Sequence, residues 1–89
     1  MNLYVDNLSP KVEEEELRRL FEEYGKVVSV EITRKSHIGK PSGYGIVEMP
    51  FSMEAMDAVE GLNGRKLRGK RLKVGEPFHY LWKARKGGK

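Results

Sequence analysis

The 89-residue sequence contains no cysteine. Disulfide bridges and thiolate metal sites are therefore excluded, and we expect a cytoplasmic protein because this composition fits a reducing compartment. No apolar run approaches the roughly 18 residues of a membrane-spanning helix, and the first predicted strand begins too near the N-terminus to leave room for a signal peptide. With 38% hydrophobic and 34% charged residues, the chain has the composition of one small globular domain that contacts no membrane.

The sequence also has few residues that could support catalysis or hold a metal. His37 and His79 are its only histidines, and they lie on separate segments without acidic neighbours at metal-ligand spacing. No serine or threonine is paired with a candidate base, and the acidic run at residues 13–16 has the character of a helix start. We therefore expect no enzymatic activity, no metal and no cofactor.

Charge is distributed unevenly along the chain. Residues 1–62 contain seven basic and twelve acidic side chains, a net charge of −5, whereas residues 63–89 contain ten basic side chains and only Glu76, a net charge of +9. Such a local concentration of positive charge is typical of proteins that bind a polyanion such as RNA or DNA. A solvated tail that only increases solubility is the alternative.

Hydrophobic periodicity predicts four strands and two helices. The strands cover residues 3–8, 27–34, 42–49 and 70–74, where apolar side chains alternate with polar ones, and a turn-rich bridge or small hairpin covers residues 65–69. The order βαββαβ predicts an α+β protein with a ferredoxin-like sandwich. In this fold a four-stranded antiparallel sheet carries two helices on one face and leaves the other face open.

Each predicted helix has a start signal and an apolar stripe. Ser9 is predicted to cap the first helix with Pro10 at its first position, and Ser52 is predicted to cap the second. The residues expected to face the core are Leu17, Leu20, Phe21 and Tyr24 in the first helix, and Ala55, Ala58, Val59 and Leu62 in the second.

Tyr4 and Tyr44 are predicted to lie on the open face of the sheet. Side chains alternate across a strand, so Tyr4 faces outward if Leu3 and Val5 face the core. The same alternation places Tyr44 and Ile46 outward. Exposed rings can stack the bases of single-stranded nucleic acid, or they can simply shield the sheet, as isolated surface aromatics do.

The first 76 residues resemble the RNA recognition motif (RRM) family, including its small bacterial single-domain members. The hexamer LYVDNL at residues 3–8 is similar to the motif on that family's first strand, and the octamer SGYGIVEM at residues 42–49 is similar to the motif on its third strand. The resemblance implies an RRM-like domain at residues 1–76 that binds single-stranded RNA. An aromatic and basic C-terminal extension follows at residues 77–89.

The resemblance assigns Tyr4 and Tyr44 to positions that stack bases in the family. Two further positions in these motifs depart from its pattern. Ile46 replaces the second ring of the octamer and would pack against a sugar or a base. Asp6 stands where glycine is common and would place a negative charge at the sheet end, where it could accept a hydrogen bond from a base.

Basic side chains are the expected phosphate contacts. Ser42 replaces the basic residue that usually opens the octamer, and Lys40 in the preceding loop would take its role. Arg71 and Lys73 share the outward phase of the last strand, opposite its apolar positions. Asn2, just before the first predicted strand, completes the predicted RNA-binding set.

The C-terminal extension supplies further candidate contacts: Tyr80, Trp82, Lys83 and Arg85. These side chains either enlarge the stacking surface or cover the open face and occlude the two tyrosines. The sequence leaves both possibilities open.

Two other functions were weighed against RNA binding. A protein-interaction or self-association module on the same fold is favoured by the departures at Asp6, Ser42 and Ile46. An acylphosphatase-like enzyme would need an arginine and asparagine constellation that the sequence does not present. We expect a monomer that binds single-stranded RNA, with single-stranded DNA and a protein partner as open alternatives.

Overall fold

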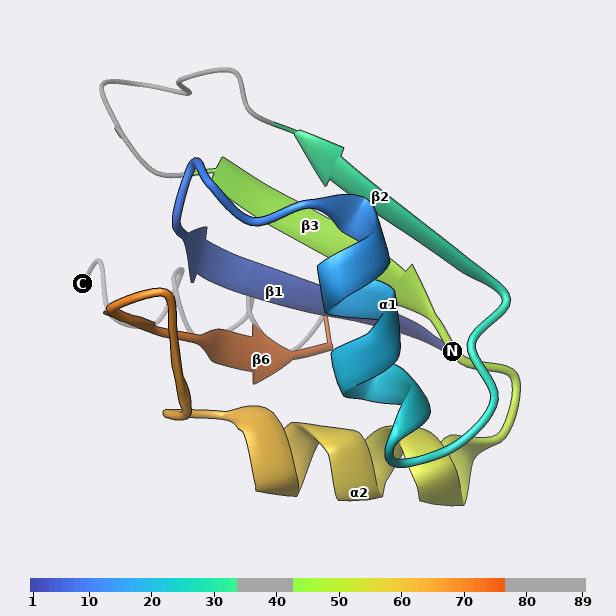
Figure 1. The fold of residues 1–89 in the computed structure, drawn as a ribbon. Helices are drawn as coiled ribbons and strands as arrows, with labels where there is room; N and C mark the ends of the chain where they lie inside the picture. Colours follow the sequence, from blue (N-terminus) through green and yellow to red (C-terminus); the bar gives the residue numbers. More distant parts are fainter. Residues whose placement is uncertain (34–42, 77–89) are drawn as a thin grey trace, which may run out of the picture.

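The computed structural model describes residues 1–33 and 43–76. The described elements follow one another in the predicted order, with one short hairpin inserted before the last strand (Figure 1). They are β1 (Asn2–Leu8), α1 (Glu14–Glu22), β2 (Ser29–Thr33), β3 (Gly43–Glu48), α2 (Ser52–Leu62), β4 (Lys66–Leu67), β5 (Lys70–Arg71) and β6 (Lys73–Gly75).

The main sheet has four antiparallel strands in the order β2-β3-β1-β6. Both helices lie on the same side of this sheet (Figure 1). The predicted α+β ferredoxin-like fold is therefore confirmed. We call the face of the sheet opposite the helices the open face. No helix in the described part of the chain is long and apolar enough to cross a membrane.

The core lies between the sheet and the two helices. Leu3, Val5 and Val47 point into it from the central strands and are fully buried. The predicted helical stripes supply the opposite wall, where Leu17, Phe21, Ala55, Ala58 and Leu62 are fully buried and Leu20, Tyr24 and Val59 are partly buried. Strand and helix periodicity thus identified the residues that hold the sheet against the helices.

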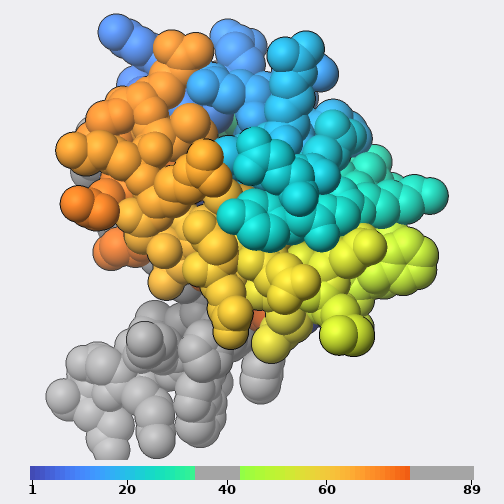
Figure 2. Space-filling model, turned by 60° about the horizontal axis from the view of Figure 1, so that its bottom comes forward, coloured from blue at the N-terminus to red at the C-terminus, as the bar shows by residue number. Residues whose placement is uncertain are grey.

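The segment that follows α1 packs against α2. A Cβ atom built on Gly61 of α2 would overlap the ring of Tyr24, which follows α1. Figure 2 shows the segments that contain these residues adjoining on one surface of the molecule. A side chain at this position would therefore have to displace the Tyr24 ring.

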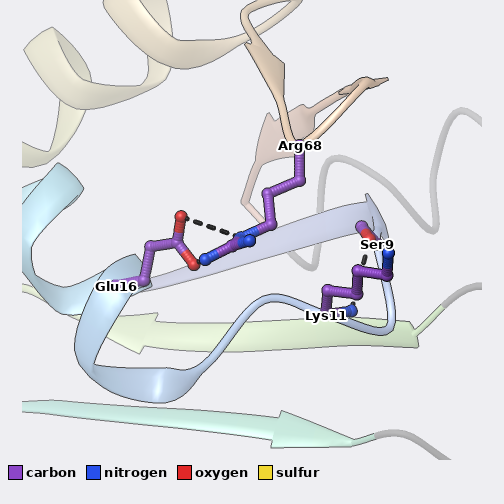
Figure 3. Close-up of polar contacts among 4 residues, drawn as sticks. All are labelled: Ser9, Lys11, Glu16 and Arg68. Carbon is purple, nitrogen blue, oxygen red and sulfur yellow. Dashed lines mark hydrogen bonds and ion pairs between the residues drawn. The ribbon is translucent and has the colours of Figure 1, made fainter.

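The helix starts differ from the sequence prediction. Ser9 caps a turn rather than α1: its hydroxyl oxygen accepts a hydrogen bond from the Lys11 N–H at 3.2 Å (Figure 3), and its carbonyl accepts one from the Val12 N–H at 3.1 Å. This turn buries Val12 completely before α1 begins at Glu14. Ser52 is likewise the first residue of α2, without a side-chain cap bond.

The predicted last strand, residues 70–74, is divided at Leu72. Lys70–Arg71 pairs with Lys66–Leu67 in a hairpin, and β6 begins at Lys73. The buried Leu72 donates its N–H to the Arg65 carbonyl at 2.9 Å, and its own carbonyl accepts the Gly64 N–H at 2.7 Å. These bonds bind Leu72 to the end of α2, so the strand cannot continue through it.

Candidate nucleic-acid interface

Strand register assembles the open face from all four strands. Tyr4 in β1 is the direct partner of Ile46 in β3 on one side and of Gly75 in β6 on the other. Ile46 is in turn the partner of Glu31 in β2. Directly paired residues project from the same face of a sheet. One row across the open face therefore reads Glu31, Ile46, Tyr4, Gly75.

Tyr4 and Tyr44 lie together at the centre of this face. Their ring centroids are 5.1 Å apart and the ring planes are inclined by 27°, a stacked arrangement. Both residues are half-buried, whereas their strand neighbours Leu3, Val5 and Gly45 are buried. The structure therefore places both rings on the open face, as alternation predicts. We refer to Tyr4 and Tyr44 as the ring pair.

The hydroxyl group of Tyr4 is held in its neutral form. Burial raises the pKa of Tyr4 above its ordinary value, and the negative charge of Asp6 and the neighbouring Tyr44 raise it further. A tyrosine hydroxyl is already neutral near pH 7, and the upward shift extends this range to higher pH, so the group keeps its hydrogen for donation as well as accepting.

A bulge in β1 determines the position of Asp6. β1 pairs with β3 as far as Val5 and resumes at Leu8, and between these residues Asn7 has a φ of 64°. The Asn7 N–H donates to Asp6 Oδ1 at 2.8 Å. Asp6 is only 7% exposed, which differs from the exposed charge expected at the sheet end. Its carboxylate stabilises the bulge.

The predicted basic residues are not equivalent in the structure. Lys73 is exposed and is the direct partner of Asp6, one row along the sheet from Tyr4. Arg71 belongs to the hairpin, where its guanidinium donates to the Gly64 carbonyl at 3.0 Å. Lys73 is therefore the basic side chain on the open face itself, and Arg71 lies on the neighbouring hairpin.

Asn2 lies one row away from the ring pair in the opposite direction. It is exposed and is the partner of Glu48, which in turn is the partner of Ser29. The Ser29 hydroxyl donates to Glu48 Oε1 at 3.4 Å. Hydrogen-bonding side chains thus extend across this end of the open face.

The sequence prediction included Asp6 but not two other acidic residues of this face, Glu31 and Glu48. The signal was available in β2, because Val30 and Ile32 pack against the core and Glu31 between them must face the other way. Direct pairing with Ile46 then places it beside the ring pair. Register between the strands, which periodicity alone does not supply, was the missing information.

Several predicted contacts lie outside the described residues: Lys40 in the segment before β3, and Tyr80, Trp82, Lys83 and Arg85 in the C-terminal extension. Ser42, where the usual basic contact is replaced, lies outside them as well. The two histidines also lie outside them. Within residues 1–33 and 43–76, no group of three acidic or histidine side chains is arranged to hold a metal ion.

Residues 3–73 match the family model described as RNA recognition motif. The chain belongs to this family. The resemblance carried by the hexamer and the octamer is thereby confirmed, and the ring pair joins the two motifs across β1 and β3.

Relatives of known name support the same assignment. RbpA of Nostoc sp., whose name describes it provisionally as an RNA-binding protein, is 40% identical over 74 residues, which cover 83% of this chain and 72% of RbpA. The cytoplasmic and nuclear polyadenylate-binding protein of Chaetomium globosum is 45% identical over 74 residues, covering 83% of this chain but only 9% of that protein.

Solved structures share the fold. RNA binding protein PG1 is 38% identical, with a TM-score of 0.75 and coverage of 85% of this chain and 92% of that chain. RNA recognition domains 1 and 2 of Sex-lethal from Drosophila melanogaster are 34% identical, again with a TM-score of 0.75, and the match covers 85% of this chain and 48% of theirs.

Proposed function

We propose that the open face binds single-stranded RNA by stacking bases on Tyr4 and Tyr44. The observation that carries this proposal is the ring pair, which lies on the sheet face opposite the helices in a chain of the RRM family. Bases in single-stranded RNA are free to splay out and stack on aromatic rings. The names of the Nostoc and Chaetomium relatives also favour RNA as the ligand.

Stacking alone supplies too little free energy for tight binding. Two stacked bases contribute about 2–6 kcal/mol, whereas a complex with a dissociation constant near 1 μM needs about 8 kcal/mol. Basic side chains must supply the remainder through the phosphates. We assign the first such contact to Lys73, and further ones to Arg71, to Lys40 and to the basic residues of the C-terminal extension. Ile46, beside Tyr4, would pack against a sugar or a base, and Asn2 would offer a hydrogen bond at the end of the face.

We propose that the chain is a binding module without catalytic activity. Its RNA-binding domain would comprise residues 1–76, and residues 77–89 would form an extension. Ring stacking makes little distinction between RNA and DNA, because every base presents a π-face. Single-stranded DNA is therefore a second ligand to be tested. We propose that the module acts as a monomer.

One observation favours a second function on the same surface. Ile46 stands beside Tyr4 where the family pattern has a further ring, so this apolar position offers no ring for stacking. A protein or a second copy of the chain could bury this surface. Sedimentation that showed a dimer without RNA, combined with no change on adding RNA, would support this function instead.

The decisive experiment is fluorescence anisotropy with a labelled random single-stranded RNA. Tyr4→Ala and Tyr44→Ala should each weaken binding by about 1–3 kcal/mol, the value of one base stack. Phe51→Ala is the matched control, because Phe51 is an aromatic side chain, 57% exposed, that lies between β3 and α2 rather than on the open face. Unchanged affinity in both tyrosine variants would exclude stacking.

A further inference from the structure

We infer that Glu31 makes the open face selective for guanine over the other bases. This inference rests on the proposed RNA binding and adds a base preference to it. Its basis is the position of one exposed carboxylate in the same row as Tyr4 and Ile46.

Glu31 differs from the other acidic residues of the open face. Asp6 is buried and accepts the Asn7 N–H, and Glu48 accepts the Ser29 hydroxyl. The side chain of Glu31 is exposed and makes no hydrogen bond or ion pair with the rest of the described chain. Within residues 1–33 and 43–76, neither of its carboxylate oxygens is therefore occupied by a protein partner.

The register places this carboxylate within reach of a stacked base. Thr33 is the direct partner of Tyr44, so Glu31, two residues earlier in β2, is a diagonal neighbour of Tyr44 on the same face. Diagonal neighbours in a sheet are roughly 7–8 Å apart. A base lying on the Tyr44 ring can cover much of this distance, and its outer edge then meets the carboxylate.

A carboxylate with two available oxygens matches one base better than the others. The Watson–Crick edge of guanine presents two adjacent donors, N1–H and the N2 amino group, which can bond the two oxygens in parallel. Adenine and cytosine present one amino donor beside a ring acceptor, and uracil presents one N–H between two carbonyls. Only guanine can therefore form the paired contact without placing an acceptor against the negative charge.

The negative charge of Glu31 also disfavours contacts with the phosphate backbone, which do not distinguish one base from another. A phosphate that approached Glu31 would be repelled, so a favourable contact on this side of the sheet requires a donor edge. Removing the charge should then have opposite effects on two ligands. Binding of a guanine-containing RNA should weaken, whereas binding of an RNA without guanine should stay equal or strengthen.

The test uses the full chain and three short single-stranded RNAs: an oligouridine, the same oligomer with one central guanosine, and the same oligomer with inosine at that position. Inosine lacks the N2 amino group but keeps N1–H. The wild-type chain should bind the guanosine oligomer at least about fivefold more tightly than oligouridine, with inosine between them. This order needs no variant and therefore does not depend on the stability of one.

Glu31→Gln then identifies the residue responsible. It should bring the affinities for guanosine and inosine oligomers together and reduce the preference for either over oligouridine to less than about twofold. Glu60→Gln is the matched control, because Glu60 is an exposed glutamate on α2 and the substitution changes net charge equally. This control should leave the wild-type order unchanged.

The two proposals fail in different ways. Equal binding of all three oligomers by the wild-type chain, with sensitivity to Tyr4→Ala retained, would overturn the guanine preference and leave RNA binding intact. A guanine preference that survives Glu31→Gln would equally overturn the role of Glu31. Absence of binding to any of the three oligomers and to random RNA would overturn RNA binding itself.

Discussion

Lys73 in β6 stands directly opposite Asp6 in β1, one row along the sheet from the ring pair. The pairing puts the exposed Lys73 side chain on the open face, although the strand that carries it is only three residues long. In the proposed complex, a cation at this position would lie next to the bases stacked on the rings and would reach the phosphates that link them. The contact has a measurable electrostatic signature.

Lys73→Gln should weaken RNA binding and make it less sensitive to salt. Each phosphate neutralised on a single strand contributes about 0.7 to the slope of log affinity against log salt concentration, so the variant should lose about that much of the slope. The measurement is a series of anisotropy titrations at increasing salt.

Lys26→Gln provides the control for the loss of one positive charge. Lys26 is exposed and lies between α1 and β2, where its backbone N–H donates to the Glu54 carboxylate of α2. This variant should keep the wild-type slope. Equal slopes for the wild-type chain and Lys73→Gln would exclude a phosphate contact at Lys73.

The fold and the centre of the site followed from local sequence patterns. Alternation in residues 3–5 and 43–47 was sufficient to place Tyr4 and Tyr44 on one face, because the apolar residues between them have no other place than the core. The apolar stripes of the two helices were likewise sufficient to predict which helical residues face the core. Burial of apolar side chains determined both results.

The differences arose where a hydrogen bond to another segment, a bulge or the burial of one side chain overrides local preference. Leu72 bonds to residues 64 and 65 and ends the expected strand, which separates Arg71 from Lys73. The bulge after Val5 buries Asp6. Burial of Val12 delays α1 beyond the Ser9 turn. Each feature depends on a partner distant in the sequence or on a backbone irregularity, and neither leaves a periodic signal.

The raised pKa of Tyr4 predicts a loss of stability in alkaline solution. Burial, Asp6 and Tyr44 together hold the proton on Tyr4 more tightly in the folded chain than in the unfolded chain. As pH rises above about 10, the unfolded state therefore loses this proton first, and the free energy of unfolding falls. Denaturant titrations across this range should show a steeper fall for the wild-type chain than for Tyr4→Phe.

Asp6→Asn examines one cause of this pKa shift directly. Asparagine keeps the oxygen that accepts the Asn7 N–H but removes the negative charge. The pKa of Tyr4, measured by the ultraviolet absorbance of tyrosinate and assigned by comparison with Tyr4→Phe, should move down while remaining raised by burial. A Tyr4 component that titrates at or below pH 10 in the wild-type chain would contradict this account.

The hairpin is joined to α1 by an ion pair between Arg68 and Glu16. Arg68 Nε donates to Glu16 Oε1 at 3.0 Å and to Oε2 at 3.2 Å (Figure 3). The side chains are 47% and 30% exposed, respectively, so water screens much of the attraction. A double-mutant cycle with Arg68→Ala and Glu16→Ala should therefore give a coupling of only about 0.2–1 kcal/mol.

High salt should reduce this coupling further, because exposed charges are screened. The companion pair Arg65–Glu23, with 3.8 Å between the charged atoms, supplies a weaker reference for the same measurement. A coupling above about 2 kcal/mol for Arg68 and Glu16 would show that the hairpin depends on this contact far more than its exposure indicates.

Replacement of Gly45 in β3 is predicted to destabilise the fold. A Cβ atom there would lie 3.1 Å from Leu17 Cδ2, 3.2 Å from the Glu31 carbonyl oxygen and 3.3 Å from Leu8 Cδ1. Because one neighbour is backbone and the others are fully buried, Gly45→Ala should overpack the core and cost about 1–3 kcal/mol of unfolding free energy.

Gly75→Ala is the matched control in another strand, where a Cβ would meet no atom within 4 Å. Denaturant titrations should show a lower unfolding free energy only for Gly45→Ala. Gly75→Ala should not lower it, because alanine meets no obstacle there and reduces the conformational entropy of the unfolded chain. Equal stability of Gly45→Ala and the wild-type chain would mean that α1 can move away from β3, and the close approach of Leu17 would then not explain the glycine between the tyrosine and the isoleucine of the open face.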